Sequence, residues 1–418
     1  MERRKDRILL CLCHMSGKEM NYVQEAFDDN WVVPLGPNVN GFEKDIEAFV
    51  GQNKRVVALS AGTAAVHLGL LACGVGPGDE VCVQSFTFCA SSHPITYLGA
   101  TPVFVDSEKK TWNMDPYLLE EAIEDRLAKT GKAPKAIIPV ALYGMPYQID
   151  LIMEVANKYD IPVVEDAAEG FGSKYKGQVL GTFGKFGVLS FNGNKMITTS
   201  GGGALITENE DEWREIMMYA TQYRESYPYY QHEKIGYNYR MSNICAGIGR
   251  GQMQIVDEHI AHHKKVQKLY EELLNDVQGV TIHSQPTTGE YDSNYWLCTI
   301  TLDKDLKVKG QENAYKEVIT SAVGGAAGVI HTAVSAITEC QPNNNVEAMR
   351  MGLDALNIES RPLWKPMHKQ PVYKDAPAYI NGVSEELFKV GMCLPAGPYV
   401  TDDDVRFIVD AIKSLIVT

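Results

Sequence analysis

Short apolar segments alternate with helix-length segments over residues 80–210, and this alternation constrains the fold more than any other feature. Five of the apolar segments are predicted strands: Val81–Val83, Pro102–Val105, Ala136–Val140, Pro162–Val164 and Val188–Phe191. Strands that are connected through helices pair side by side in one direction, so the pattern predicts a largely parallel sheet covered by helices. In such sheets ligands bind at the carboxyl ends of the strands.

The second half of the chain follows a different pattern. A long helical stretch is predicted from Ser242 to about Val277, and strands such as Tyr295–Thr301 then mix with helices. We therefore expect an α/β protein with a large αβα domain over residues 1–255. Residues 256–418 are expected to form a long linking helix and a small α+β domain. A length of 418 residues fits this division, since a domain averages about 150 residues.

Composition excludes several classes of protein. Hydrophobic residues make up 45% and charged residues 22% of the chain, which is the balance of a soluble globular protein. The net charge of −14 argues against a nucleic-acid or membrane-surface partner, and no apolar run approaches the ~18 residues of a spanning helix. The nine cysteines are scattered, which favours a reducing, cytoplasmic location.

Two short motifs could take part in ligand binding. Ser60-Ala-Gly62-Thr63 opens a predicted helix, and the free amides of a helix start bind phosphate, although an ordinary helix cap has the same sequence. Asp166 ends the apolar strand that begins at Pro162, at the edge where ligands gather. Alone, it could equally cap a loop.

Two further motifs follow other strands. Lys195 comes just after the strand Val188–Phe191, among glycines and small polar residues, so its amine could face a pocket rather than solvent. Phe86 and Phe88 follow the strand at Val81–Val83, where an aromatic ring could stack on a planar ligand or simply pack in the core.

Together the four motifs meet the requirements of one cofactor, pyridoxal 5′-phosphate (PLP). An enzyme that uses PLP needs a lysine to bond it, a carboxylate against its ring nitrogen, a phosphate site at a helix start and an aromatic against its ring. The order along the chain also fits, with Lys195 29 residues after Asp166.

Longer segments resemble a known family, the DegT-type sugar-nucleotide aminotransferases, which have the aspartate aminotransferase fold (fold type I). The matching segments are Met15–Glu19, Trp31–Pro37, Ser60–Thr63, Pro77–Glu80, Glu165–Glu169, Ser190–Lys195, Gly236–Met241 and Glu359–His368. The segment Gly324–Asn345, rich in alanine and glycine, departs from the family pattern, and its role stays open.

The resemblance implies a role for each matching residue. Lys195 would be the catalytic lysine that bonds the cofactor, and Asp166 would pair with the ring nitrogen. The other residues implied to bind the cofactor are Gly62, Thr63, Phe86, Ala168, Ser190 and Asn238. Among them, Asn238 would reach the phosphate of the neighbouring subunit, which implies a homodimer with shared active sites. The residues implied to bind substrate are Glu169, Arg240, Trp364 and His368.

The resemblance also implies a reaction. The amino donor would be glutamate, and the acceptor a nucleotide-linked keto sugar. The segment Trp364–His368 looks most like the branch that aminates C4 of UDP-linked 4-keto-6-deoxy-N-acetyl sugars, as in bacillosamine synthesis. A GDP-linked sugar, as in perosamine synthesis, or a dTDP-linked keto sugar is the alternative. Lys195 separates the chain from the sugar dehydratase branch, which has histidine there.

Other classes of function remain open at the sequence level. They are a non-catalytic regulator that binds PLP, and a β-lyase or desulfurase that acts on amino acids. His259, His262 and His263 could share a helix face and bind a metal, but a solvated face explains them as well, and no metal site is predicted. Seven tyrosines between Tyr219 and Tyr239 favour either a sugar-nucleotide site or a subunit interface.

Overall fold

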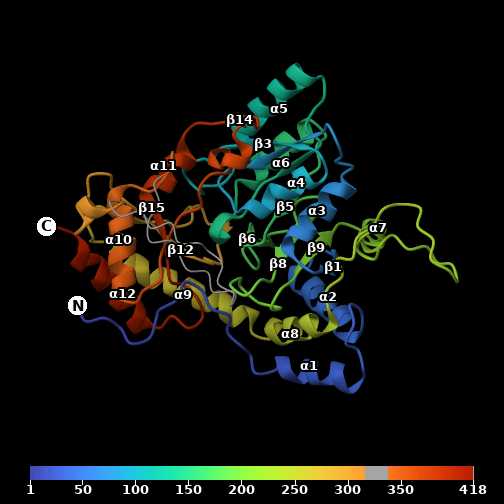
Figure 1. The fold of residues 1–418 in the computed structure, drawn as a ribbon, viewed down its shortest axis with the longest axis horizontal. Coiled ribbons are helices and arrows are strands. Elements are labelled where there is room, and N and C mark those ends of the chain that lie inside the picture. The colour runs from blue at the N-terminus through green and yellow to red at the C-terminus, as the bar shows by residue number, and fades with distance from the viewer. Residues whose placement is uncertain (316–337, 418) are drawn as a thin grey trace.

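The computed structural model describes residues 1–315 and 338–417. Its centre is a twisted sheet of mostly parallel strands (Figure 1). The order across the sheet is β1 (Arg55–Leu59), β9 (Gly203–Thr207), β8 (Phe186–Ser190), β5 (Val164–Asp166), β4 (Ala136–Ile138), β2 (Glu80–Gln84), β3 (Thr101–Val105) and β14 (Ala378–Tyr379). A parallel bridge between Ile137 and Val163 joins the two halves at β4 and β5. Of these strands only β9 runs against its neighbours.

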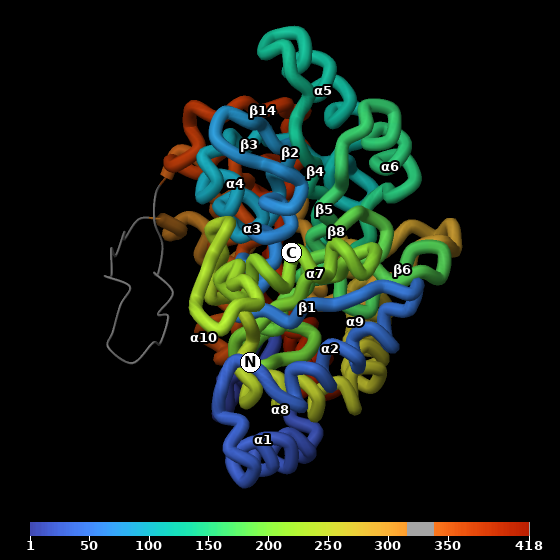
Figure 2. Tube along the Cα trace, turned by 90° about the vertical axis from the view of Figure 1, so that its right-hand side faces the viewer, coloured from blue at the N-terminus to red at the C-terminus, as the bar shows by residue number. Residues whose placement is uncertain are grey.

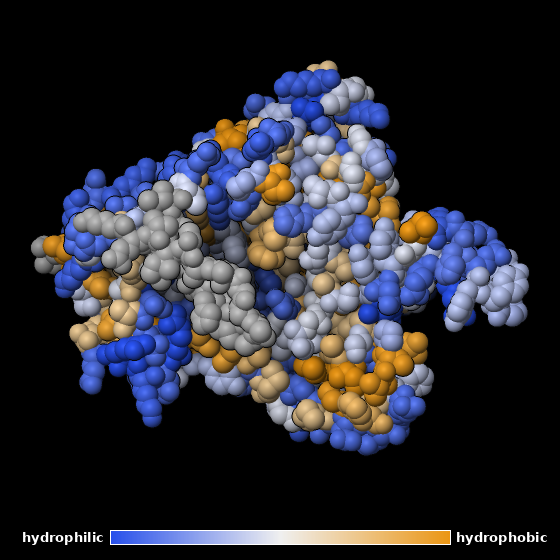
Figure 3. All heavy atoms as spheres, in the orientation of Figure 1, coloured by the Kyte–Doolittle hydropathy of each residue, from blue (hydrophilic) through white to orange (hydrophobic). Residues whose placement is uncertain are grey.

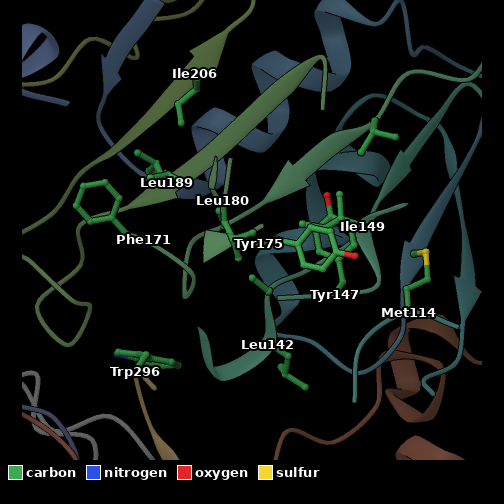
Figure 4. Packing of buried hydrophobic residues seen from close by; sticks show 14 of the residues in the cluster. Met114, Leu142, Tyr147, Ile149, Phe171, Tyr175, Leu180, Leu189, Ile206 and Trp296 are labelled. Carbon is green, nitrogen blue, oxygen red and sulfur yellow. The ribbon is translucent and has the colours of Figure 1, made fainter. Parts of the chain in front are cut away.

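Helices cover both faces of this sheet, as the alternation in the sequence predicts. One face packs on α2 (Pro37–Val50), α5 (Pro116–Thr130) and α6 (Ile149–Lys158). The other face packs on α3 (Gly62–Ala72), α4 (His93–Tyr97) and α7 (Glu210–Ala220). Strand alternation divides each strand between the two cores, since Val81 and Val83 face one core and Cys82 the other. Figure 4 shows part of the first core, from Leu189 and Phe171 to Tyr147 and Ile149.

A second, antiparallel sheet lies in the carboxyl-terminal part of the chain. Its strands, in order, are β10 (Val280–Ile282), β12 (Cys298–Leu302), β15 (Gly391–Leu394) and β13 (Arg361–Pro362). The helices of this part are α9 (Val256–Leu274), α10 (Asn344–Ala355), α11 (Val383–Val390) and α12 (Asp402–Leu415). A small third sheet joins β11 (Tyr291–Asp292), β6 (Lys174–Tyr175) and β7 (Gln178–Val179).

The α/β fold class, with a mostly parallel sheet and a smaller α+β part, is therefore confirmed. The second sheet has its own hydrophobic core, to which Ile8 is the one contributor from before residue 256. This separation supports the division between residues 255 and 256, which stays a prediction.

The expected long helix from Ser242 is two helices. They are α8 (Asn243–Met253) and α9, and the chain breaks between them at Gln254 and Ile255. The helix α8 packs closely on α1 (Glu19–Asp28), where a Cβ at Gly251 would lie 2.7 Å from the Glu19 nitrogen. The helices α1 and α5 lie at opposite ends of the molecule (Figures 1 and 2).

Two further expectations concern membrane-spanning helices and the alanine- and glycine-rich stretch. None of the helices in the described ranges is long and apolar enough to cross a membrane. Residues 324–337 of the alanine- and glycine-rich stretch lie outside the described residues, and residues 338–343 lead into α10.

Candidate active site

A cavity of about 340 Å³ lies where the carboxyl ends of β5 and β8 meet the first turn of α3. Its wall combines polar and apolar residues from segments far apart in the sequence. The polar and charged ones are Ser60, Thr63, Thr87, Ser91, Asp166, Glu169, Ser190, Asn192, Asn194 and Lys195. Trp296 and Trp364 of the carboxyl-terminal part close one side. The position matches the expected ligand edge of a parallel sheet.

Lys195 projects into this cavity from the loop that follows β8. Its Nζ lies 3.3 Å from Glu169 Oε1 and 3.9 Å from the centre of the Trp296 ring, and its side chain is 13% exposed. Glu169 Oε2 accepts a hydrogen bond from the Tyr143 N–H at 2.7 Å, which fixes the carboxylate. Burial raises the pKa of Glu169, and the positive charge of Lys195 acts in the opposite direction. The amine is thus held between an aromatic face and an acid.

Asp166 lies buried in the same cavity at the end of β5. Its Oδ2 accepts a hydrogen bond from Ser91 Oγ at 2.7 Å, and its Oδ1 accepts one from the Ala168 N–H at 3.1 Å. Burial raises the pKa of Asp166, while these hydrogen bonds and Lys195 favour the charged form. A carboxylate in this position can hold a proton on a heterocyclic nitrogen that is placed against it.

The first turn of α3 supplies an anion site at another part of the wall. No side chain of the described residues caps this helix, so its first N–H groups are available to a ligand. Gly62 is required by its surroundings, because a Cβ there would lie 2.9 Å from Ser190 Cβ and 3.2 Å from Ser190 Oγ. The amides of Gly62 and Thr63 and the hydroxyl of Ser190 therefore meet at one place.

These features fit PLP on structural grounds. The open helix start with Ser190 suits its phosphate, the buried Asp166 suits its ring nitrogen, and Lys195 in the same cavity suits the covalent bond. Gly62, Thr63, Ser190, Ala168, Asp166 and Lys195 all line the cavity, as the sequence predicts. Glu169 and Trp364 of the predicted substrate set line it too.

The position of the stacking aromatic must be corrected. Phe86 is fully buried in the core of the large sheet and does not line the cavity. Phe88, two residues later, lines the cavity and packs on Trp364, with the ring centres 5.3 Å apart. As the chain leaves β2, the first phenylalanine completes the core and only the second reaches the ligand edge.

Arg240 and His368 also lie elsewhere than the substrate role requires. The Arg240 guanidinium is buried in an ion pair with Glu43 and a hydrogen bond to the Ala58 carbonyl, so it braces β1. His368 lies behind the wall, where Nδ1 is 2.7 Å from Ser85 Oγ and Nε2 is 3.3 Å from Glu385. His368 positions the segment that carries Trp364 but does not line the cavity.

Asn238 is exposed and does not line the cavity of its own chain. It belongs to the segment between α7 and α8, which projects from the body of the molecule (Figure 1). An antiparallel bridge to Thr221 holds Asn238 at the base of this segment, which we call the arm (residues 221–239). The arm carries most of the tyrosine cluster, and Tyr229 and Tyr230 are more than half exposed.

Two residues of the site, Ser91 and Trp296, escape sequence reasoning, whereas Phe88 is named there beside Phe86. Ser91, which donates to Asp166, and Phe88 belong to the run Phe86–Ser92, whose small and aromatic residues were a usable signal. Trp296 lies about 100 residues from Lys195 in sequence, and its Nε1 donates to the Asn194 carbonyl at 2.6 Å. No local pattern predicts such a contact between the two parts of the chain.

Two of the three histidines that could share a helix face, His259 and His263, have backbone partners. His259 Nδ1 lies 3.0 Å from the Met196 carbonyl oxygen, and His263 Nδ1 lies 3.1 Å from the Tyr295 carbonyl oxygen. Within residues 1–315 and 338–417, no group of three or more His, Cys, Asp or Glu is placed to hold a metal ion.

Fold and site together define a PLP-dependent enzyme of fold type I. Comparison with known proteins gives the family: residues 14–326 and 311–413 match the model of the DegT/DnrJ/EryC1/StrS aminotransferase family. The chain therefore belongs to this family, and it is an aminotransferase.

Individual relatives align over nearly the whole chain. A Bacillus subtilis protein named as a pyridoxal phosphate-dependent aminotransferase, EpsN, is 41% identical over 98% of this chain and 96% of its own length. The GDP-perosamine synthase of Caulobacter vibrioides is 34% identical over 98% of this chain and 99% of its own. The crystal structure of a DegT DnrJ EryC1 StrS aminotransferase from Brucella abortus superposes with a TM-score of 0.80 at 26% identity, and 95% of each chain is covered.

Proposed function

We propose that the protein transfers the amino group of glutamate to the 4-keto carbon of a UDP-linked 4-keto-6-deoxy-N-acetyl sugar. The observation that carries the proposal is the shared cavity of Lys195 and Asp166, walled by Trp364. Trp364 begins the segment Trp364–His368, whose sequence resembles the branch that uses such sugars.

The residues of the cavity would have different roles in the reaction. When bound, PLP carries the amino group between the two substrates and takes up the electrons released when a C–H bond breaks. Lys195 removes the Cα proton of glutamate and later delivers a proton to C4 of the sugar. Glu169 lies 3.3 Å from the Lys195 amine and holds it in the cavity, where Cα of glutamate and C4 of the sugar must each be placed within its reach. In the net reaction glutamate becomes 2-oxoglutarate and the keto sugar becomes an amino sugar.

A GDP-linked 4-keto sugar is the second candidate for the acceptor. The similarity to the GDP-perosamine synthase of Caulobacter vibrioides favours it, because that similarity spans nearly the full length of both chains. A dTDP-linked keto sugar is a third candidate, while a non-catalytic regulator does not fit a chain that is an aminotransferase.

A panel of acceptors tests the substrate. The purified protein with PLP and glutamate should aminate C4 of the UDP-linked 4-keto-6-deoxy-N-acetyl sugar, as seen by NMR of the product. Its kcat/KM should exceed that of GDP- and dTDP-linked 4-keto sugars by at least about tenfold, since a site built for one set of polar groups rejects analogues strongly. A higher kcat/KM for a GDP-linked or dTDP-linked sugar would replace the UDP assignment.

We further propose that the protein works in the cytoplasm as a homodimer with shared active sites. All nine cysteines are free, in keeping with a reducing compartment. Lys195 is the one cationic residue among the described residues that line the cavity, and it is committed to the amine chemistry. A phosphate dianion bound at α3 therefore gains from further donors brought by a second chain.

Two surface features support a second copy as the partner. The arm extends from the body of the molecule (Figure 1), and its Tyr227, Tyr229 and Tyr230 are exposed. Apolar side chains also gather on the end of the molecule that carries α1 (Figure 3). There Met20, Phe27 and Leu35 are each more than half exposed, and a patch of this kind is typical of a protein interface. In a two-fold dimer each chain makes the same contacts to the other. Each arm would therefore bring its Asn238 to the phosphate site of the other chain.

Mixed dimers test the sharing. Lys195→Ala and Asn238→Ala are each expected to be impaired, because the first lacks the proton carrier and the second loses a hydrogen bond to phosphate worth about 1.5–3 kcal/mol. If the site is shared, one site of a mixed dimer carries both lesions and the other carries neither. Activity after subunit exchange should then rise well above that of either parent. Activity at the average of the parents, with mixed dimers confirmed by mass spectrometry, would show that Asn238 serves its own chain.

A further inference from the structure

The cofactor cavity is too small for the whole acceptor that the proposed function requires. Its volume of about 340 Å³ lies near the lower end of the ~300–1,000 Å³ that a single drug-sized ligand fills. The cofactor occupies part of that space, and the keto sugar must reach Lys195 in the remainder. The nucleoside diphosphate of a nucleotide sugar must therefore lie outside this cavity.

A second pocket adjoins the cavity on the side of Trp364. This outer pocket has a volume of about 540 Å³ and shares Thr87, Phe88 and Trp364 with the cofactor cavity. The two spaces therefore adjoin at Thr87, Phe88 and Trp364. A ligand whose sugar reaches the cofactor cavity past Trp364 can extend directly into the outer pocket.

The outer pocket offers flat and apolar surfaces to a base. Phe88 is 48% exposed and Val372 is 73% exposed, although both are large apolar side chains. The rings of Phe88 and Trp364 lie at 53° to each other, and both residues line the pocket. Aromatic faces bind bases by stacking, with ~1–3 kcal/mol per base in nucleic-acid sites.

The charge of the outer pocket suits a diphosphate. Lys365 and His93 line it together with the amide of Gln370, and none of the described residues that line it is acidic. Among the ion pairs of the described residues, none involves Lys365, whereas the nearby Lys369 is paired with Glu385 at 3.0 Å. The Lys365 segment is also fixed in place, because the Met367 N–H donates to the Ser85 carbonyl at 2.7 Å. A held, unpaired cation beside aromatic faces is the arrangement that a nucleotide requires.

We propose that the outer pocket binds the nucleoside diphosphate of the acceptor, with Lys365 on the diphosphate and Val372 against the nucleoside. This inference rests on the proposed function and adds a binding site to it. Trp364 then stands at the border between the sugar and the nucleotide.

The test measures nucleotide binding and turnover separately. Calorimetry with UDP and with GDP, on protein loaded with PLP, should give at least one measurable Kd. Lys365→Met should weaken that Kd about tenfold or more, which is the size of one lost charge-assisted hydrogen bond, and should raise the KM for the sugar nucleotide similarly. The rate of reaction with glutamate alone should change less than twofold, because glutamate does not reach the outer pocket. Lys369→Met is the matched control, and its Kd and KM should equal those of the wild type.

A second variant guards against a misleading single result. Val372→Glu places a carboxylate on an exposed position of the outer pocket, so it should repel the diphosphate without disturbing the core. Unchanged Kd and KM in both Lys365→Met and Val372→Glu would overturn the inference, as would a wild-type protein that binds neither UDP nor GDP. If no sugar nucleotide is aminated but nucleotide binding still depends on Lys365, the proposed function fails while the outer pocket stands.

Discussion

Replacing Lys195 by alanine should abolish turnover while the protein stays folded. We expect a loss of at least about 10⁴-fold in kcat, or about 5 kcal/mol, because the lysine is both the covalent attachment point and the proton carrier. The fold should survive, since the Lys195 amine contacts Glu169 and the Trp296 ring and the side chain belongs to none of the three hydrophobic cores of the described residues. Steady-state kinetics with glutamate and the acceptor, with the thermal unfolding midpoint recorded alongside, measure both expectations.

A second lysine provides the control for this experiment. Lys185 lies on the surface, 41% exposed, with its amine 3.6 Å from Glu212. Lys185→Ala should keep activity within about twofold of the wild type, since exposed pairs of this kind contribute about 0–1 kcal/mol. Activity of Lys195→Ala within tenfold of the wild type would contradict the assignment of the catalytic lysine.

The sequence predicts the parts of the site that follow strands. Asp166 ends β5 and Lys195 follows β8, and adjacent parallel strands bring their carboxyl ends together, so the distance of 29 residues in sequence becomes a shared cavity. The sequence predicts Gly62 for a related reason, because the small and polar residues of a helix start after a strand indicate a phosphate site.

The parts that the sequence could not predict depend on packing between distant segments. Phe86 and Phe88 have the same local pattern, and only the finished core decides which one is buried. In the sequence nothing shows that Arg240 is paired. In the structure its guanidinium forms an ion pair with Glu43 and a hydrogen bond to the Ala58 carbonyl. Likewise, the reversed direction of β9 between β1 and β8 is a property of the whole sheet, since parallel and antiparallel strands have similar apolar sequences.

Asp166 and Glu165 are neighbours whose substitutions should have very different effects. Both carboxyls are buried, but strand alternation sends them to opposite faces of β5. Asp166 faces the cavity beside Ser91, while Glu165 Oε2 accepts a hydrogen bond from the Phe183 N–H at 3.1 Å. The two acids are adjacent in the sequence, and the structure places them on opposite faces of the strand.

Asp166→Asn should lower kcat about 10³-fold, equivalent to about 4 kcal/mol, with little change in the unfolding midpoint. An amide cannot carry the negative charge that keeps a proton on a ring nitrogen, so the electrons of the broken C–H bond would lose their acceptor. Asparagine keeps the size of aspartate, and its oxygen can still accept from Ser91 Oγ. The kcat of the variant should therefore fall even when its PLP content, read from absorbance, equals that of the wild type.

Glu165→Gln is the matched variant on the other face of the strand, and kcat should stay within about threefold of the wild type. Burial raises the pKa of Glu165 to about 7, so the unfolded chain ionises this carboxyl before the folded chain does, and the wild type loses stability as pH rises from the ordinary glutamate pKa toward 7. A neutral glutamine removes this loss, so the unfolding midpoint of the variant relative to that of the wild type should increase as pH rises to about 7 and stay level from pH 7 to 9. Equal losses of kcat in Asp166→Asn and Glu165→Gln would mean that the strand is merely disturbed. A large loss confined to Asp166 would place the chemistry on the cavity face, because the two substitutions make the same change at adjacent buried positions.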